Sequence, residues 1–323
     1  IPGRVPKPRE LRFGRGTGGH RDKHMLFGNT VPAASSGPIA VGADGSYRLI
    51  TSPKVRKLVS WGYVTTDGLD VYYEIHGGLP DSARPPFVLL PGGAMTIETA
   101  FADDLLPMLR RLRPVIAMEM QGHGHTGDRQ GPITLEQMAR DASAVLAHLE
   151  VGSAHFVGHS LGALVSFGVA ISHPNQGASI TAIGATYTFD DMLPELGKLQ
   201  RDPSHEPSAE LIPLLPTADE FAAWTDSFRR SAPEPDAFEE ILGRLNVMLA
   251  QWPGWPRADI AALTAPVLLV IGDNDFVRID RAAEAARLIP DAQLAVLPGT
   301  THMSIVRRGA WLVPLIEARI VGG

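Results

Sequence analysis

Short, continuously apolar runs recur along most of this chain and alternate with stretches of helical periodicity. The runs lie at residues 87–90, 115–118, 155–157, 180–183, 267–271 and 294–297. Runs of this length are typical of strands that are buried on both faces of a sheet. The predicted helices lie at 98–112, 134–149, 161–172, 279–289 and 306–320. The alternation predicts an α/β fold, with a mostly parallel sheet and helices on both faces.

A long segment interrupts this alternation. Residues 188–256 contain no good strand, several prolines, and amphipathic stretches near 218–230 and 235–251. We predict that the segment forms a helical cap (a lid) over the carboxyl edge of the sheet. The α/β core then comprises residues 58–187 and 257–323. Near its start, residues 71–75 alternate like an antiparallel strand.

The first 57 residues differ from the rest in composition and charge. They are rich in Pro, Gly and Arg, and residues 1–24 contain seven Lys or Arg but only two Asp or Glu, whereas the whole chain has a net charge of −6. We predict a flexible basic extension over residues 1–57. Gly14, Gly16 and Gly19 match a dinucleotide-binding pattern, but no strand is apparent before them and no helix after them. We therefore predict no cofactor there.

Composition excludes several classes of protein. The 323 residues include no cysteine, which excludes disulfides, thiolate metal sites and a cysteine nucleophile. No apolar run approaches the roughly 18 residues that a membrane-spanning helix needs. The acidic net charge argues against a nucleic-acid partner. Because no signal peptide is recognisable, we expect a cytoplasmic protein, and the choice between monomer and homodimer stays open.

Gly158, His159, Ser160, Leu161 and Gly162 form a Gly-x-Ser-x-Gly pattern between a predicted strand and a predicted helix. The pattern alone is weak in a glycine-rich chain, but this context makes it informative. Flanking glycines permit a sharp turn that presents the serine hydroxyl at the N-terminus of the helix. The backbone N–H of Leu161 can there point at a developing oxyanion. The context therefore predicts that Ser160 is a nucleophile.

A serine nucleophile needs a base, and the base needs an orienting group. The predicted strand at 267–271 runs into Asp273 and Asp275, and the one at 294–297 runs toward His302. Catalytic groups of open α/β sheets lie at the carboxyl ends of strands, so we expect these residues near Ser160. The two aspartates share side-chain parity in an extended chain, so spacing alone leaves both open.

Five segments together resemble the α/β-hydrolase superfamily, specifically the esterase-like hydrolases with a small helical lid. They are LLPGGAM, MQGHGHTG, VGHSLGA, PVLLVIGDNDFV and LAVLPGTTHMS. The resemblance covers about residues 58–323 and implies an eight-stranded, mostly parallel sheet. It also implies that Ser160 is the nucleophile and His302 the general base and then acid. Asp275 would be the orienting carboxylate, because in the family pattern the acid precedes an apolar residue, and Asp273 is its rival.

The resemblance further implies an oxyanion hole made of the backbone N–H groups of Leu161 and Gly93. Ala94 is an alternative to Gly93 as the second donor. In the family this loop usually begins with His-Gly, and here Pro91 stands in place of the histidine. Because the donor is a backbone N–H, the replacement need not abolish function.

The remaining histidines receive structural interpretations. His123 and His125 lie in a loop that the family uses as a turn, and we also expect a structural role for the segment Glu119-Met120-Gln121 before it. His159, next to Ser160, should shape the floor of the site. The other histidines show no spacing typical of zinc ligands, so we predict no metal.

Apolar side chains of the predicted cap indicate the kind of substrate. They are Leu193, Leu196, Leu211, Leu214, Leu215, Phe221, Trp224, Phe228, Leu242, Leu245, Met248 and Leu249. Most must pack the cap onto the sheet, and the remainder should line a hydrophobic pocket that suits a small uncharged ester. With the resemblance, this predicts a carboxylesterase that needs no cofactor. The alternatives are a lactonase, an amidase or carbamate hydrolase, a cofactor-free perhydrolase, and a non-catalytic ligand-binding protein.

Overall fold

The computed structural model of the protein describes residues 39–41, 47–49, 58–78, 80, 84–202 and 204–321. Most of the predicted N-terminal extension, with its pattern of Gly14, Gly16 and Gly19, lies outside the described residues. Within that extension, the short strands β1 (Ile39–Val41) and β2 (Tyr47–Leu49) pair antiparallel. Among the described helices, none has both the length and the apolar composition that crossing a bilayer requires.

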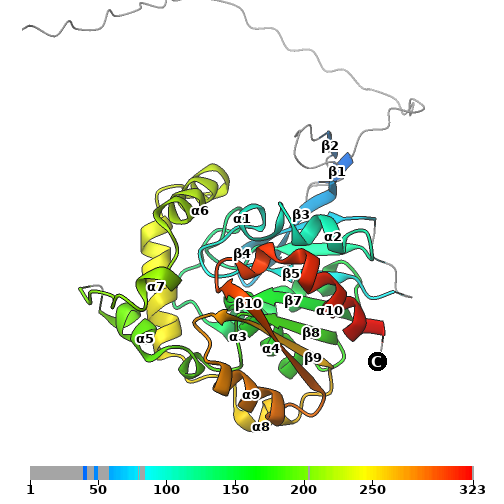
Figure 1. Ribbon diagram of the computed structural model, residues 1–323. Coiled ribbons are helices and arrows are strands. Elements are labelled where there is room, and N and C mark those ends of the chain that lie inside the picture. Colours follow the sequence, from blue (N-terminus) through cyan, green and yellow to red (C-terminus); the bar gives the residue numbers. More distant parts are fainter. Residues whose placement is uncertain are drawn as a thin grey trace, which may run out of the picture. The chain divides into compact units, whose positions relative to one another are not determined.

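Eight strands form the main sheet, in the order β10-β9-β8-β7-β5-β6-β4-β3 (Figure 1). They are β3 (Leu58–Thr66), β4 (Leu69–His76), β5 (Phe87–Leu90), β6 (Val115–Met118), β7 (Ala154–His159), β8 (Gly177–Ile183), β9 (Val267–Asn274) and β10 (Ala292–Thr301). The strands from β10 to β6 are parallel, and β4 and β3 are antiparallel. The strands β5, β6 and β7 are buried along their whole length. The predicted mostly parallel, eight-stranded α/β sheet is confirmed.

The strand β3 lies where no strand is predicted above. It pairs with β4 across a tight turn at Asp67 and Gly68, whose φ angles are 46° and 75°. Glycine adopts such angles freely and aspartate tolerates them, so Asp-Gly is a strong hairpin signal. The signal is present in the sequence, and reading it would have added this strand to the prediction.

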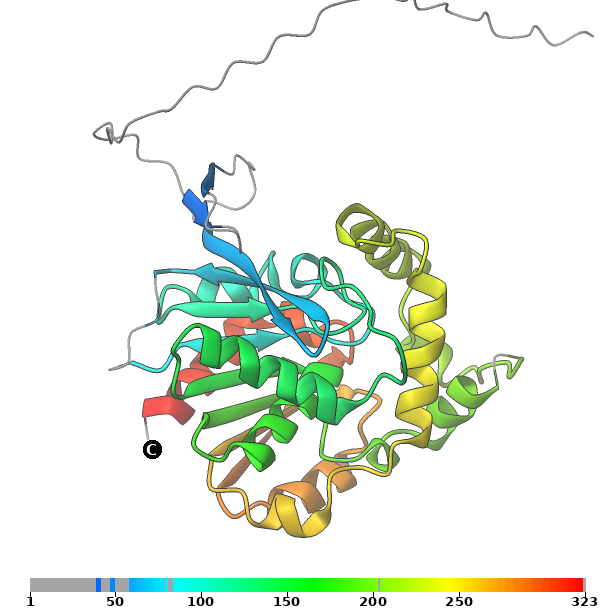
Figure 2. The same ribbon diagram turned by 180° about the vertical axis from the view of Figure 1, so that it is seen from behind.

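Helices cover both faces of the sheet, as predicted. The helices α3 (Leu135–His148) and α4 (Leu161–Ser172) lie on one face, and α2 (Leu105–Leu109) and α10 (Gly309–Val321) lie on the other (Figure 1 and Figure 2). The helix α9 (Ile279–Leu288) packs against β9 and β10.

The prediction of a single helix over residues 98–112 is wrong. Two short helices stand there, α1 (Ile97–Phe101) and α2, and they are separated near Asp104. The Asp104 backbone has φ −137° and ψ −70°, and its Oδ2 accepts a hydrogen bond from Gly309 N (2.7 Å) at the start of α10. This tertiary contact overrides local helix propensity. The helix predicted from residue 306 also begins later, at Gly309, after the 3-10 turn η3 (Ile305–Arg307).

We call residues 184–266, between β8 and β9, the helical insertion. Its elements are η1 (Phe189–Asp191), α5 (Pro194–Arg201), η2 (Ile212–Leu214), α6 (Ala218–Ser231), α7 (Phe238–Gln251) and α8 (Arg257–Ala261). The helix α7 packs against both α5 and α6 (Figure 1). Helices α6 and α7 stand where the amphipathic stretches are predicted. The assignment of residues 188–256 as a cap domain stays a prediction.

His155 is buried near the start of β7, at the opposite end of the strand from Ser160. Its Nδ1 lies 2.8 Å from Ser179 Oγ, and its ring packs 5.8 Å from that of Phe87, centre to centre. Burial, together with the positive charge of Arg113, lowers the pKa of His155 to about 4. The folded protein therefore keeps this ring neutral at pH values where an unfolded chain protonates it.

We expect the free energy of unfolding to fall as the pH drops from about 6.5 toward about 4, because only the unfolded chain binds a proton at His155 in this range. One such group contributes a slope of at most about 1.4 kcal/mol per pH unit. Urea unfolding across this range should show a shallower slope for His155→Asn than for the wild type. Equal slopes would contradict the prediction, whatever the variant's absolute stability.

Candidate active site

Ser160 occupies a sharp turn between β7 and α4. Its φ is 50° and its ψ −114°, and its N–H donates to the carbonyl of Ile183 on β8 (2.8 Å). A Cβ on Gly158 would lie 2.3 Å from the carbonyl oxygen of Gly162, and one on Gly162 would lie 2.1 Å from that of Leu90. Both glycines are therefore required by the strained turn that presents the Ser160 hydroxyl at the start of α4.

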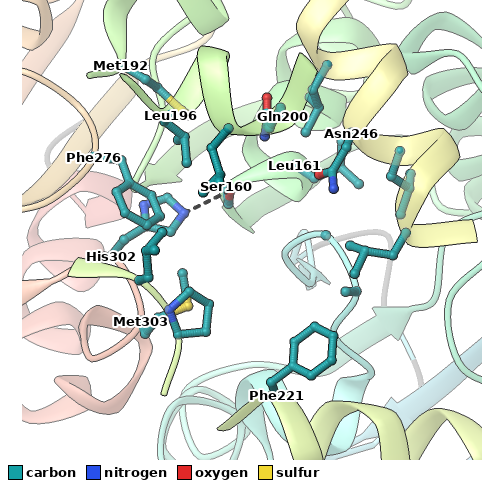
Figure 3. A pocket seen from close by; sticks show the side chains of 18 of the residues that line it. Ser160, Leu161, Met192, Leu196, Gln200, Phe221, Asn246, Phe276, His302 and Met303 are labelled. Carbon is teal, nitrogen blue, oxygen red and sulfur yellow. Dashed lines mark hydrogen bonds between the residues drawn. The ribbon is translucent and has the colours of Figure 1, made fainter. Parts of the chain in front are cut away.

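Three strand ends bring Ser160, His302 and Asp275 together. His302 Nε2 lies 3.0 Å from Ser160 Oγ, the contact drawn as a dashed line in Figure 3. His302 Nδ1 lies 2.7 Å from Asp275 Oδ1, and both of these side chains are buried. Ser160 follows β7, Asp275 follows β9, and His302 follows β10. This is the carboxyl edge at which the sequence places them.

The Asp275 carboxylate sets the orientation of the His302 ring. Burial alone would raise the pKa of Asp275, but the electrostatic attraction and the hydrogen bond of the His302 ring hold it below its usual range. The backbone N–H groups of Val277 (3.2 Å) and Gly272 (3.3 Å) act in the same direction. An ionised carboxylate only accepts hydrogen bonds, so His302 donates from Nδ1 and keeps the Nε2 lone pair for the Ser160 hydroxyl.

Asp273, the other candidate acid, binds backbone N–H groups and not the His302 ring. Its Oδ2 accepts from Gly299 N (3.0 Å) and its Oδ1 from Thr300 N (3.0 Å). These backbone hydrogen bonds lower the pKa of this exposed carboxyl. The structure thus places Asp275 at the His302 ring, and places Asp273 at the turn that leads to His302.

Two backbone N–H groups are free beside Ser160. They belong to Leu161, at the first position of α4, and to Gly93, in the loop after β5. Both residues line the cavity in front of Ser160, and a Cβ on Gly93 would lie 3.9 Å from Leu161 Cδ2. Within the described residues, neither N–H donates a hydrogen bond. Both N–H groups are therefore available to a carbonyl oxygen bound in this cavity.

The N–H of Ala94, the alternative donor, is already used. It donates to Nε2 of His123 (3.2 Å), and Ala94 itself adopts a left-handed conformation with φ 65°. His123 Nδ1 lies 2.9 Å from the carbonyl oxygen of Gln121, so Nδ1 carries the proton and Nε2 accepts. Burial lowers the pKa of His123 and keeps its ring neutral. The geometry therefore favours Gly93 over Ala94.

His159 holds the backbone at His302. Its Nε2 donates to the His302 carbonyl oxygen (3.0 Å), and the two rings lie 5.0 Å apart, centre to centre. Burial, followed by the charge of His302, lowers the pKa of His159 to about 3. A ring that remains neutral keeps this donor in place without adding a charge beside His302.

The loop after β6 connects the site to the helical insertion. Buried Glu119 accepts from Ile97 N (3.0 Å) at the start of α1, and from His125 N (2.6 Å). Further along the loop, Asp128 accepts from Gln121 Nε2 (2.7 Å) and pairs with Arg244 of α7. A second Arg244 nitrogen donates to the carbonyl oxygen of Gly131 (2.6 Å). The structural role expected for this loop thus corresponds to specific contacts.

A cavity of about 510 Å³ separates Ser160 from the helical insertion (Figure 3). Seven of the apolar cap residues selected from the sequence line it: Leu196, Leu215, Phe221, Trp224, Leu242, Leu245 and Leu249. Further apolar walls are Phe189, Met192, Phe276 and Met303, which sequence reasoning missed. Among the lining residues, His302 alone has a titratable side chain. The cavity therefore suits an uncharged ligand.

Sequence reasoning also missed Gln200 and Asn246 in the cavity wall. It gave His123 a structural role in a turn, but not its contact with the loop of Gly93. Periodicity could have found the two amides, because each stands at helical spacing within an apolar stripe, four residues after Leu196 and Leu242 respectively. No sequence signal points to the contact of His123 with Ala94. Within the described part of the chain, no three His, Asp or Glu side chains are placed to hold a metal ion.

We expect His123→Leu to lower the free energy of unfolding by about 1–3 kcal/mol, because it leaves the buried N–H of Ala94 without an acceptor. His123→Gln is the matched control, since its amide oxygen can replace Nε2 as acceptor, and it should recover part of the loss. Urea unfolding of the three proteins measures the difference. Equal stability of the Leu variant and the wild type would contradict the role assigned to this hydrogen bond.

Comparison with known proteins identifies a family that matches this chain and several proteins of similar sequence. The model of the alpha/beta hydrolase family matches residues 87–315. The chain is 30% identical to the pimeloyl-[acyl-carrier protein] methyl ester esterase of Neisseria meningitidis serogroup A, over 69% of this chain and 72% of that protein. It is 26% identical to the candidate carbamate hydrolase RutD of Azorhizobium caulinodans, over 72% of this chain and 88% of that protein.

Solved structures show the same fold. The enol-lactonase from Burkholderia xenovorans matches with a TM-score of 0.64 at 19% identity, over 80% of this chain and 99% of that one. A likeness at this level of identity concerns the fold alone. The family match, in contrast, spans well over half of the chain and includes every strand from β5 to β10. This protein belongs to the alpha/beta hydrolase family.

Proposed function

We propose that this protein is a serine hydrolase that cleaves small uncharged carboxylic esters through an acyl-enzyme intermediate. The observation that carries the proposal is the chain of hydrogen bonds from Ser160 through His302 to Asp275, which opens onto an apolar cavity. Gly93 and Leu161, whose N–H groups donate to no described residue, line the same cavity. Together these groups supply a nucleophile, an oriented base and stabilisation of an oxyanion.

In the proposed reaction, His302 Nε2 accepts and releases a proton in each of two steps. Ser160 Oγ attacks the ester carbonyl carbon while its proton passes to His302, and the N–H groups of Gly93 and Leu161 hold the resulting oxyanion. When the bond to the alcohol breaks, His302 returns the proton to the leaving oxygen. A water molecule then gives a proton to His302 and attacks the acyl carbon, and Ser160 recovers its proton as the acid leaves.

The lining of the cavity supports an uncharged substrate. A charged group buried there would have only His302 as an ionisable neighbour, and burial of an unpaired charge is costly. The similarity to a methyl ester esterase agrees with an ester. Similarity to a candidate carbamate hydrolase keeps carbamates as the second substrate class, because the same serine attack suits their carbonyl group.

We expect Ser160→Ala to lower kcat/KM by about 10³-fold or more, because the nucleophile is lost. The assay is hydrolysis of p-nitrophenyl esters with acyl chains of increasing length. The acyl length with the highest kcat/KM also indicates how long a chain the cavity accommodates. Ser172→Ala, at the exposed far end of the same helix, is the control and should retain wild-type turnover. If the wild type hydrolyses no ester of the series, the ester proposal fails, and carbamates and lactones are tested next.

A second experiment distinguishes the two aspartates. Asp275→Asn should lower kcat by about 10³-fold or more, because an amide no longer fixes the proton on His302 Nδ1. Asp273→Asn keeps an acceptor for one backbone N–H and should lower kcat by less than about tenfold. Comparable losses in the two variants, measured on one p-nitrophenyl ester, would refute the assignment of Asp275.

A further inference from the structure

Two amide side chains stand in the otherwise apolar wall of the cavity that the helical insertion provides. Gln200 comes from α5 and Asn246 from α7, and both line the cavity with Ser160. Figure 3 shows their amide groups on the side of the cavity where Ser160 and Leu161 lie, with Phe221 on the opposite side. Thr217, the other polar residue that the insertion contributes, is already used in the cap of α6, where it accepts from Glu220 N.

Neither amide has a hydrogen-bond partner in the described protein. The Oε1 atom of Gln200 is enclosed and accepts no hydrogen bond from any described residue. Asn246 likewise forms none within the described ranges. An enclosed acceptor without a partner, such as Gln200 Oε1, destabilises the fold, so packing alone does not explain an amide at position 200.

The positions of the two amides within their helices also indicate that packing alone does not require them. In α5, Gln200 follows Leu196 by four residues and Leu199 by one, and all three side chains line the cavity. In α7, Asn246 stands in the same way four residues after Leu242. A leucine at either position would continue the apolar stripe. Two helices therefore interrupt their apolar faces at the same wall.

The chemistry of an amide defines what it can bind. A side-chain amide offers both N–H donors and a carbonyl acceptor and carries no charge. A half-turn about the terminal torsion exchanges the oxygen and nitrogen of Gln200, so that either atom can face the cavity. A group that matches such an amide both donates and accepts hydrogen bonds. It is also neutral, because His302 is the only titratable residue among those that line the cavity.

We propose that Gln200 and Asn246 form a specificity subsite for an amide group carried by the substrate, in its acyl or its alcohol part. The proposal rests on the proposed ester hydrolysis and narrows its substrate class. The preferred substrates are esters in which an uncharged amide replaces part of an otherwise apolar chain. Purely aliphatic esters of the same length fill the cavity but leave both side chains unpaired.

The test compares matched esters that differ only in this group. For the acyl part, the pair is the p-nitrophenyl ester of N-acetyl-β-alanine and that of hexanoic acid. For the alcohol part, the pair is 2-acetamidoethyl butyrate and pentyl butyrate. In Gln200→Met and Asn246→Leu, which keep side-chain volume, the ratio of kcat/KM for the amide ester to that for the alkyl ester should fall about tenfold in at least one pair.

The control is Leu199→Met, which changes the shape of the same wall without changing its hydrogen bonds. Its ratio should stay within about twofold of the wild type. Ratios within twofold of the wild type for both amide variants in both pairs would overturn the proposal, as would an equal fall in Leu199→Met. If one amide variant fails to fold, the other carries the test.

Two further measurements separate this subsite from the proposed function and from a structural role. Turnover of the alkyl esters by the wild type, and its loss in Ser160→Ala, test the hydrolase alone. The ratio is read only between esters that the wild type cleaves, so the subsite can fail while the hydrolase stands. The melting temperature of Gln200→Met without substrate should equal or exceed that of the wild type, whereas a structural role for the amide would lower it.

Discussion

The hydrogen bond between His302 Nδ1 and Asp275 Oδ1 is the interaction on which the candidate active site depends. It selects the tautomer in which Nε2 faces Ser160, and burial of both partners shields it from water. Phe276 packs against one part of the ring, 4.7 Å away centre to centre, and His159 packs 5.0 Å away. These contacts hold the His302 ring in one orientation. The hydrogen bond to Ser160 Oγ therefore depends on where the turn between β7 and α4 places the serine.

The loop that carries Gly93 is supported in the same manner, by buried groups that stay uncharged or fully bonded. His123 accepts from Ala94 N and donates to Gln121, so its proton position is set by its own neighbours. Glu119 spreads its charge over backbone N–H groups, one of them at the start of α1. The donors of the proposed oxyanion hole are backbone groups. Their positions therefore depend on the supporting side chains of His123 and Glu119 rather than on which side chain stands at position 93.

The accuracy of sequence-based prediction varied with how local the deciding contacts are. The runs at β5 and β6 were predicted to the residue, because a strand buried on both faces carries its own signature. The break at Asp104 could not be predicted, because it depends on Gly309, which is 205 residues away. Parity could not separate Asp273 from Asp275, because the first still belongs to β9 and the second lies beyond its end, where the chain turns toward His302.

Arg244 links α7 to the loop after β6. Its partners Asp128 and Gly131 belong to the loop that also carries Gln121 and His123. An outward swing of α7 that widens the cavity must therefore either break the contacts of Arg244 or drag this loop along. The positions of α7 and of the loop after β6 therefore depend on each other through Arg244.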